Sequence, residues 1–383
     1  MKAYWFSAPL PRQDMRLPAL DLLRFFAALM VLLYHYTASG VGNTNFPNRY
    51  NLIASTELLP GWSNVTHFGF MGVNLFFLIS GFIIFASASG RTALDFAVYR
   101  WIRLFPTYWV SILFTLAMLW FFLGASLEVS AFEVAANLTM VQPYLGVTHL
   151  DPVYWTLLVE LHFYILIGLA LLTRQLGAYR FWLSLWLISA IGYRLVGQPF
   201  FLKYLIAPDY SAYFIAGMTL CALRTERRDP WAWLVLLGSF ALACSYLPEQ
   251  IAFYNFGTST GFDWLAGSLL LALGFAALTA ISLGYWNPAN RPWILLLGSL
   301  TYPLYLVHHQ LGRYLIDAWY GQMPGLVILL LCTALSLLFA LLVHLLGDRW
   351  IAGACRQVYK HRIRPKLTHR PKPKGPAHGS LPS

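Results

Sequence analysis

The sequence predicts an all-α integral membrane protein with about ten transmembrane helices. Of the 383 residues, 58% are hydrophobic and only 11% are charged, whereas soluble domains carry roughly 25% charged residues. Several apolar runs exceed the roughly 18 residues that suggest a spanning helix, and Leu104–Leu127 contains no charge. Such long apolar runs indicate helices rather than the short alternating strands of a β-barrel.

Hydropathy predicts the residue range of each transmembrane helix along the chain. The expected spans are 18–37, 71–89, 104–124, 153–173, 181–197, 204–223, 231–247, 262–281, 293–312 and 324–347. The fifth and sixth are the weakest, because Arg194, Lys203 and Asp209 interrupt them. The first is a span rather than a signal peptide, since Asp21 and Arg24 lie where a signal's apolar region would begin.

Lys and Arg are unevenly distributed between the predicted loops. They occur before the first span, in alternate loops and after the tenth span, whereas the loop that contains Glu128, Glu133 and Asp151 has none. The positive-inside rule therefore places both termini in the cytoplasm and the acidic loop outside. We expect a cytoplasmic N-terminal segment (1–17), a transmembrane domain (18–347) and a basic, disordered cytoplasmic tail (348–383) that rests on anionic lipid.

Two functional classes find no support in the sequence. The net charge of +11 comes mostly from the tail, and the other basic residues are scattered at loop ends, so nucleic-acid binding is not expected. His and carboxylate residues do not cluster at ligand spacing, and the four cysteines are far apart without a CxxC pair. We therefore expect neither a metal site nor a disulfide framework.

The first span carries polar residues on one face. Arg24 and His35 are eleven residues apart, which is about three helical turns or roughly 16 Å, and Asp21 lies on nearly the same stripe. An arginine in a span costs about 2.5–3.5 kcal/mol, so it should face protein or water. The alternative is an Asp21–Arg24 pair at the cytoplasmic surface with an interfacial His35.

Other spans carry similar candidates. Arg100 and Arg103 share a helix face at the predicted cytoplasmic edge and offer guanidinium forks suited to phosphate, or they are ordinary topology signals. Glu160 lies two turns into an apolar helix, with Thr156 and Tyr164 on its face, and needs a partner such as an arginine.

Two further patterns concern spans nine and two. A polar stripe at three-to-four spacing in span nine contains Tyr302, Tyr305 and His308 or His309, which are also common in membrane belts. Span two opens with the small and amide residues Gly72, Asn74, Ser80 and Gly81, which favour close helix contacts.

In combination and order, these motifs resemble the acyltransferase 3 family of membrane-bound O-acyltransferases, bacterial enzymes that often acetylate cell-surface glycans. The matching segments, from about residue 17 to 345, are Arg24 and His35 with ten residues between, Gly72-Val-Asn74…Phe77-Leu-Ile-Ser80-Gly81, Arg100-Trp-Ile-Arg103, Trp155-Thr-Leu-Leu-Val-Glu160…Phe163-Tyr164 and Thr301-Tyr302-Pro-Leu-Tyr305-Leu-Val-His308.

The resemblance implies acetyl-CoA as acyl donor and a hydroxyl of a cell-surface glycan or lipid-linked saccharide as acceptor, at the bacterial inner membrane. With this donor, our candidate catalytic residues are His35, Glu160 and Arg24. Arg100 and Arg103 lie on the predicted cytoplasmic side, where they are our candidates to hold the phosphates of the coenzyme. Candidates for substrate contact or support are Asp21, Asn74, Ser80, Trp155, Tyr164, Tyr302, Tyr305 and His308.

Two questions stay open at the level of the sequence. His35 either accepts the proton of the acceptor hydroxyl or carries the acyl group covalently. The competing class is a transporter or a glycan flippase, because intramembrane Arg, Glu and His also mark ion paths. Paired broken helices in two halves of the chain would support a transporter, and the sequence shows none.

Overall fold

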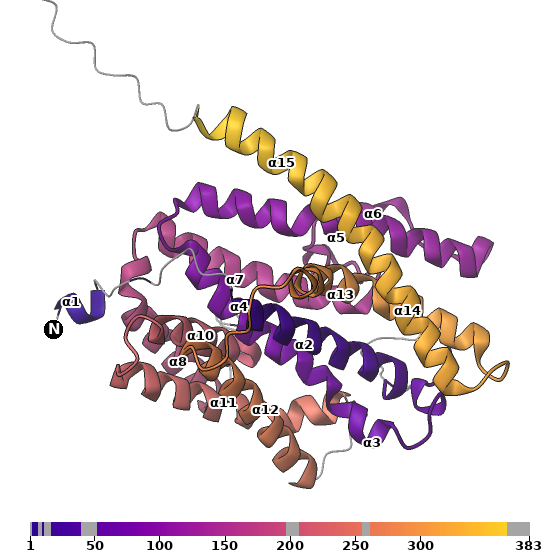
Figure 1. The fold of residues 1–383 in the computed structure, drawn as a ribbon, viewed down its shortest axis with the longest axis horizontal. Helices are drawn as coiled ribbons and strands as arrows, with labels where there is room; N and C mark the ends of the chain where they lie inside the picture. Colours follow the sequence, from indigo (N-terminus) through magenta and orange to yellow (C-terminus); the bar gives the residue numbers. More distant parts are fainter. Residues whose placement is uncertain are drawn as a thin grey trace, which may run out of the picture.

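The computed structural model describes residues 2–6, 10, 17–39, 52–196, 207–254 and 261–365. Throughout these ranges the regular structure is helical and no strand occurs, which confirms the all-α class (Figure 1). Each of the ten predicted spans overlaps a helix of at least 16 residues. These helices are α2 (Pro18–Thr37), α4 (Met71–Ala88), α5 (Ala93–Leu123), α7 (Trp155–Leu172), α8 (Tyr179–Val196), α10 (Pro208–Leu223), α11 (Pro230–Tyr254), α12 (Gly261–Ser282), α13 (Pro292–Trp319) and α14 (Gly325–Val343).

Short helices connect or flank these ten. They are α1 (Lys2–Phe6), α3 (Ser63–Thr66), α6 (Ala131–Leu138) and α15 (Ala352–Val358). The helix α6 lies in the acidic loop and begins with a capping box, in which Ser130 and Glu133 satisfy each other's backbone N–H groups. This loop is therefore a folded element that leads into α7.

Seven helical segments of the described chain are long and apolar enough to cross a membrane. The segments that meet this test contain α2, α4, α5, α7, α11, α12 and α14. Of the remaining three, α8 carries Arg180 and Arg194, α10 has only 16 residues, and α13 carries the polar stripe. The total of ten spans therefore stays a prediction.

The helix α10 lies at the centre of the bundle. Apart from Asp209 and Tyr210, all of its residues are buried. A Cβ atom added to Gly217 would overlap the backbone of α4 at Leu78, and one added to Gly81 would overlap α10 at Phe214. The two helices thus touch backbone to backbone, which confirms the close contact that the small residues of span two predicted.

Two helices extend beyond their predicted ends. The helix α5 begins at Ala93 rather than near 104, because Thr92 caps it by accepting from the Asp95 N–H at 3.1 Å. The last helix continues from α14 through a π-helical turn and α15 to residue 365. Residues 348–365 of the predicted tail are therefore helical, and 366–383 lie outside the described residues.

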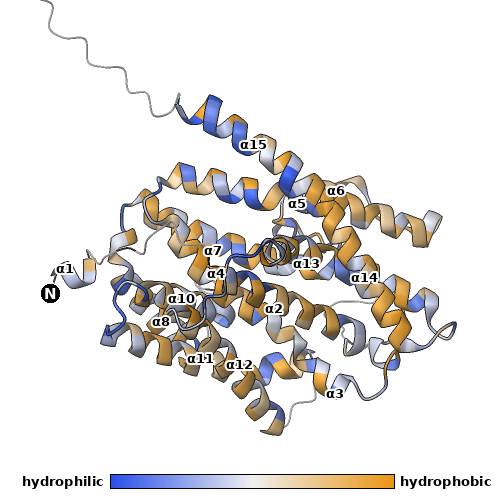
Figure 2. Ribbon diagram, viewed as in Figure 1, coloured by the Kyte–Doolittle hydropathy of each residue, from blue (hydrophilic) through white to orange (hydrophobic). Residues whose placement is uncertain are grey.

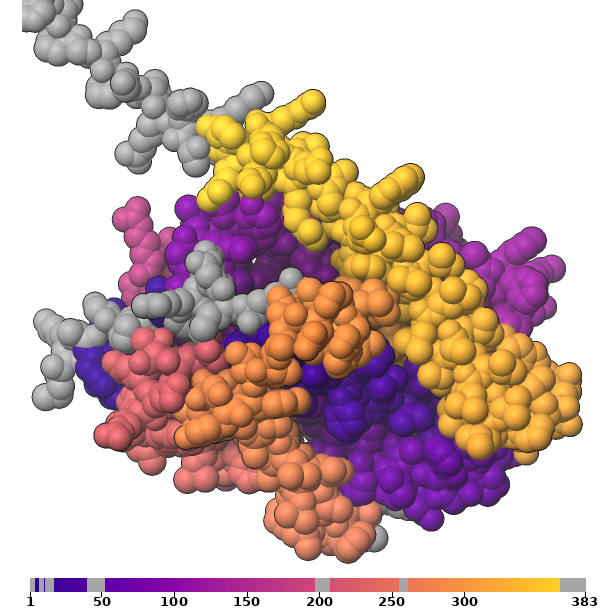
Figure 3. All heavy atoms as spheres, in the orientation of Figure 1, coloured from indigo at the N-terminus to yellow at the C-terminus, as the bar shows by residue number. Residues whose placement is uncertain are grey.

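The C-terminal helical run packs along the start of α5, as Figure 3 shows. Tyr359 donates to Asp95 at 2.8 Å, and Arg364 pairs with the same carboxylate at 3.0 Å. Figure 2 shows that hydrophilic residues gather on α15 and at helix ends, while the middle segments of the long helices are mainly hydrophobic.

Arg180, which lies between the fourth and fifth predicted spans, has a structural role. Arg180 is 2% exposed, donates to Asp229 at 2.8 and 3.1 Å, and also pairs with Glu226. Its guanidinium donates to the backbone oxygen of Tyr4 at 2.9 Å and lies over the Tyr4 ring. This network joins α1, α8 and the turn before α11.

Candidate active site

The pairing of α2 with α13 sets the position of the first-span histidine. Gly312 leaves room for the ring of Tyr36, whose hydroxyl donates to the backbone oxygen of His308 at 2.8 Å. The same hydroxyl lies 2.7 Å from Ser336 Oγ on α14. Tyr36 is fully buried, so this three-helix junction fixes the register of α2 against α13.

This register brings His35 against His308. His35 Nδ1 lies 2.9 Å from His308 Nε2, while His308 Nδ1 lies 3.0 Å from the carbonyl oxygen of Leu304 and 2.9 Å from that of Tyr305. A carbonyl can only accept, so His308 Nδ1 carries a proton and its neutral ring has a bare Nε2. His35 Nδ1–H must then donate, which leaves His35 Nε2 with a free lone pair.

A second histidine lies beside this pair. The ring centroids of His35 and His309 are 4.6 Å apart in an edge-to-face arrangement. His309 Nδ1 is 3.0 Å from Asp151 Oδ1, and Asp151 is fully buried. Gln310 also holds this loop, because its backbone N–H donates to Asp151 Oδ2 and its side chain donates to the Leu150 oxygen.

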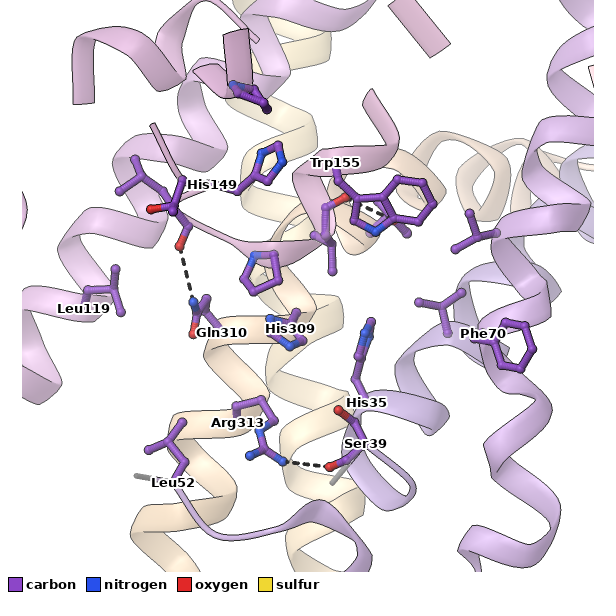
Figure 4. Close-up of a pocket in the computed structure, with 18 of the residues that line it drawn as sticks. His35, Ser39, Leu52, Phe70, Leu119, His149, Trp155, His309, Gln310 and Arg313 are labelled. Atoms are coloured by element: carbon purple, nitrogen blue, oxygen red, sulfur yellow. Dashed lines mark hydrogen bonds between the residues drawn. The ribbon is translucent and has the colours of Figure 1, made fainter. Parts of the chain in front are cut away.

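His35 and His309 line a cavity of about 510 Å³. Figure 4 shows them side by side, with Trp155 and His149 on the loop side and Arg313 below. Aromatic rings from α2, α7, α11, α13 and the helical turn before α4 form much of the wall. They belong to Tyr34, Phe70, Trp155, Tyr254 and Tyr305.

The acidic loop supplies the polar outer wall through Glu133, Thr148 and His149. Burial lowers the pKa of His149 to about 4, so this ring is neutral at pH 7. The cavity therefore combines an apolar interior with a few hydrogen-bonding groups, which is the usual composition of a small-molecule site.

Arg313 closes the lower side of the cavity. Its guanidinium donates to Ser55 Oγ at 2.7 Å and to the Ile53 oxygen at 2.8 Å, and it reaches the Ser39 oxygen at 3.4 Å (Figure 4). These bonds tie the segments on either side of 40–51 to α13. The guanidinium of Arg313 therefore donates its hydrogen bonds to backbone and hydroxyl oxygens of the cavity floor.

A separate polar cluster surrounds Glu160. Its carboxylate accepts from Tyr164 at 2.7 Å and from Ser80 at 3.2 Å. The predicted contact with Tyr164 is present, whereas Thr156 instead donates to Tyr305 at 3.0 Å. Within the described residues no ion pair joins Glu160 to an arginine.

The two arginines of the Arg-x-x-Arg motif lie at this second cluster. Arg103 pairs with Asp348 at 3.2 Å and lies over the Tyr302 ring at 5.7 Å. Arg100 donates to Ser87 and lies over Tyr164 at 5.5 Å. Both guanidinium groups therefore sit among hydroxyl and aromatic side chains near the start of α5.

Arg24 reaches the same cluster from α2. The charges of Asp21, Glu160 and Arg103 lie close enough to act on it. In the described part of the chain Arg24 makes no direct hydrogen bond or ion pair, and it takes part in this cluster through the nearby charges. Asp21 packs against Gly298 on α13, where any larger residue would collide with it.

The predicted site residues thus fall into two groups along α2. His35, Trp155 and Tyr305 line the cavity and His308 supports it, whereas the other candidates lie elsewhere. The Glu160 cluster holds Arg24, Ser80, Arg100, Arg103, Tyr164 and Tyr302, with Asp21 at its edge. Asn74 belongs to neither group and donates to Gln250 at 3.0 Å.

Sequence reasoning missed the pair of His309 and Asp151. It treated Asp151 only as a loop charge and His309 only as an alternative to His308. The two residues are 158 positions apart, and no local spacing links them. Two consecutive histidines in an apolar span were the one available signal.

Comparisons with known proteins agree with the sequence motifs. A family model for an acyltransferase domain matches residues 17–345. Acyltransferase MdmB from Streptomyces mycarofaciens is 23% identical over 335 residues, which cover 80% of this chain and 81% of that protein. No solved structure matches the chain. Across the described residues, no group of three or more His, Cys, Asp or Glu is arranged to hold a metal ion.

Proposed function

Since this chain belongs to the acyltransferase 3 family of membrane acyltransferases, we propose that it moves an acetyl or other short acyl group from acyl-CoA to a hydroxyl of a cell-surface glycan or lipid-linked saccharide. The observation that carries this proposal is the position of His35, which contacts His308 through Nδ1 and lines a cavity of about 510 Å³. An alcohol bound there would have a base for its proton.

His35 would act as the general base. The hydroxyl oxygen of the acceptor attacks the thioester carbonyl carbon while its proton moves to His35 Nε2, and the carbon–sulfur bond then breaks. His308 supports this role, because its fixed tautomer requires His35 to present Nε2 in the unprotonated form. Such a bound proton acceptor typically contributes about 10²–10⁴-fold to the rate.

The donor would enter from the cluster at the other end of α2. Coenzyme A carries phosphates, and the forks of Arg100 and Arg103 suit bidentate phosphate contacts. Arg24 supports this route, because its charge lies near those of Glu160 and Arg103 and it lies on the same helix as His35. The pantetheine arm would pass along α2, so that a cytosolic coenzyme serves an acceptor on the outer side of a bacterial inner membrane.

The acceptor would occupy the aromatic part of the cavity. Trp155, Tyr254 and Phe70 offer flat apolar faces, while Gln310 and His149 provide hydrogen-bonding groups. Sugars have both apolar C–H faces and hydroxyls, so this composition supports a saccharide or another hydroxylated molecule with an apolar part.

Transfer of radiolabel from acetyl-CoA tests the function directly. Membranes of the native host, with and without the gene, would be incubated with acetyl-CoA labelled in the acetyl group. We expect labelled glycan or glycolipid only where the protein is present, and loss of that label after mild alkali, which cleaves esters. A transporter or flippase would leave the transferred label equal in both membranes.

A further inference from the structure

When His35 acts as the general base for acyl transfer, the departing coenzyme A sulfur is left as a thiolate that needs a proton. We propose that His309, held by Asp151, is the general acid that supplies this proton, an inference that rests on the function proposed above. The pair lies next to His35 but shares none of the hydrogen bonds that fix the His35 tautomer. It therefore offers an acid beside the base.

The surroundings of Asp151 favour a cationic partner. The carboxylate is 0% exposed and accepts from the backbone N–H groups of Val153 at 3.1 Å and Gln310 at 3.2 Å. A buried carboxylate needs a cationic partner to offset its lost hydration. Within the described part of the chain, the basic side chain paired with Asp151 is His309, at 3.0 Å.

His35 has the opposite environment. Its ring nitrogen partner is the neutral imidazole of His308, and no carboxylate contacts it within the described residues. Neighbouring titratable groups whose surroundings favour opposite protonation states are the usual basis for assigning an acid and a base. The geometry assigns His35 Nε2 as the acceptor and His309 Nε2–H as the donor.

The step balances without another reactant. The acceptor O–H bond breaks and its proton goes to His35 Nε2, while the new carbon–oxygen bond forms. The carbon–sulfur bond breaks, and the thiolate takes the proton of His309 Nε2. The proton on His35 then returns to His309 across the 4.6 Å between the ring centroids, directly or through one water, and the site is restored.

The pH dependence of transfer reports on this assignment. The titratable or charged groups around His309 are His35 from α2, His308 and Arg313 on α13 itself, and Asp151, Glu133 and His149 from the acidic loop. A neutral His35 and a protonated His309 are both required, so the wild-type rate should rise and then fall with pH.

Two variants distinguish a general acid at His309 from a residue that only packs against its neighbours. His309→Gln removes the ionisable proton, whereas Asp151→Asn keeps a hydrogen-bond acceptor and removes the negative charge. The assay would use native membranes as the acceptor source and labelled acetyl-CoA as donor, with turnover measured from pH 5 to 9. A matched control is His67→Gln, which removes a histidine 3.8 Å from Asp263, outside the cavity wall.

We expect His309→Gln to lose about 10²–10⁴-fold in turnover and to lose the alkaline fall. Asp151→Asn should move the alkaline fall to lower pH, because an imidazolium without its carboxylate gives up its proton more easily. The His67→Gln control should keep the wild-type profile. Thermal denaturation in detergent would show whether each variant is folded.

The outcomes distinguish the two proposals. A wild-type protein that transfers no label overturns the proposed function. The role of His309 alone is overturned if the wild-type protein transfers label in a way that depends on His35 and the alkaline fall in turnover is unchanged in Asp151→Asn. If the His309→Gln variant is too slow for its pH profile to be measured, the pH at which turnover of Asp151→Asn falls on the alkaline side decides whether His309 is the acid.

Discussion

At the scale of single residues, the chemistry depends on which nitrogen of each histidine carries a proton. His308 is fixed by two backbone carbonyls, and it passes that choice to His35 through one hydrogen bond of 2.9 Å. Backbone acceptors cannot change their role, so the tautomer of His35 follows from the fold of α13.

The first prediction concerns His35 itself. His35→Gln keeps a polar group of similar size but cannot accept the proton, so transfer should fall by about 10²-fold or more. Coenzyme binding should remain, because the arginines lie at the other cluster. The measurements are labelled acetyl transfer and acetyl-CoA binding on the same preparation. Near-normal transfer by the glutamine variant would rule out His35 as the base.

The second prediction concerns His308 as a positioning residue. His308→Leu removes the acceptor for His35 Nδ1–H and should lower turnover by about 10–100-fold, as loss of an orienting partner does elsewhere. In His308→Gln the amide oxygen takes the place of Nε2 and should restore part of the rate. Equal activity of the two variants would mean that His308 only fills space.

At the scale of helices, backbone contact between α4 and α10 holds the centre of the bundle. In Gly217→Ala the new methyl group would press on the Leu78 oxygen and lie 2.8 Å from the Phe82 nitrogen. Since backbone cannot yield as a side chain does, we expect about 1–3 kcal/mol of destabilisation.

Gly168→Ala on α7 is the matched control for this helix contact. No atom lies within 4 Å of a Cβ added at Gly168, and alanine favours a helix over glycine by about 1 kcal/mol. Thermal denaturation in detergent should therefore show a lower midpoint for Gly217→Ala and an equal or higher one for Gly168→Ala. The opposite order would contradict the close packing.

The junction between α5 and the C-terminal helical run gives a further prediction. Arg103→Lys keeps the charge beside Asp348 but loses the planar fork. If Arg103 holds a coenzyme phosphate, the KM for acetyl-CoA should rise by about tenfold, equivalent to about 1.4 kcal/mol, with little change in kcat. An unchanged KM, with stability maintained, would leave Arg103 as a link to Asp348.

At the scale of the whole molecule, the two polar clusters lie at different levels of one bundle. The Glu160 cluster contains Arg100 and Arg103 near the start of α5, and the histidine cavity lies under the acidic loop. The positive-inside rule predicts that the first faces the cytoplasm and the second faces outward.

Cysteine labelling tests this orientation. Ser130 is a poor position for a probe because it caps α6, whereas Ala125 and Thr225 are exposed at the two predicted sides. An impermeant maleimide should label Ala125→Cys in intact cells and Thr225→Cys only after permeabilisation, relative to the parent protein. The reverse pattern would contradict the topology and the proposed donor route.

Local patterns in the sequence were sufficient to predict the helical elements and several contacts within them. Apolar runs located ten helices, and four-residue spacing placed Tyr164 beside Glu160. The glycines of span two predicted its close packing. These inferences succeed because helical periodicity and backbone hydrogen bonding are local properties, set by residues a few positions apart.

The grouping of distant residues into one site could be seen only after the helices were packed together. The meeting of His309 with Asp151, the tautomer of His35 and the burial of Arg180 among Glu226, Asp229 and Tyr4 all join distant segments. Each depends on how helices are rotated and shifted against one another. That register is set by many small side-chain contacts at once, which no spacing along one helix encodes.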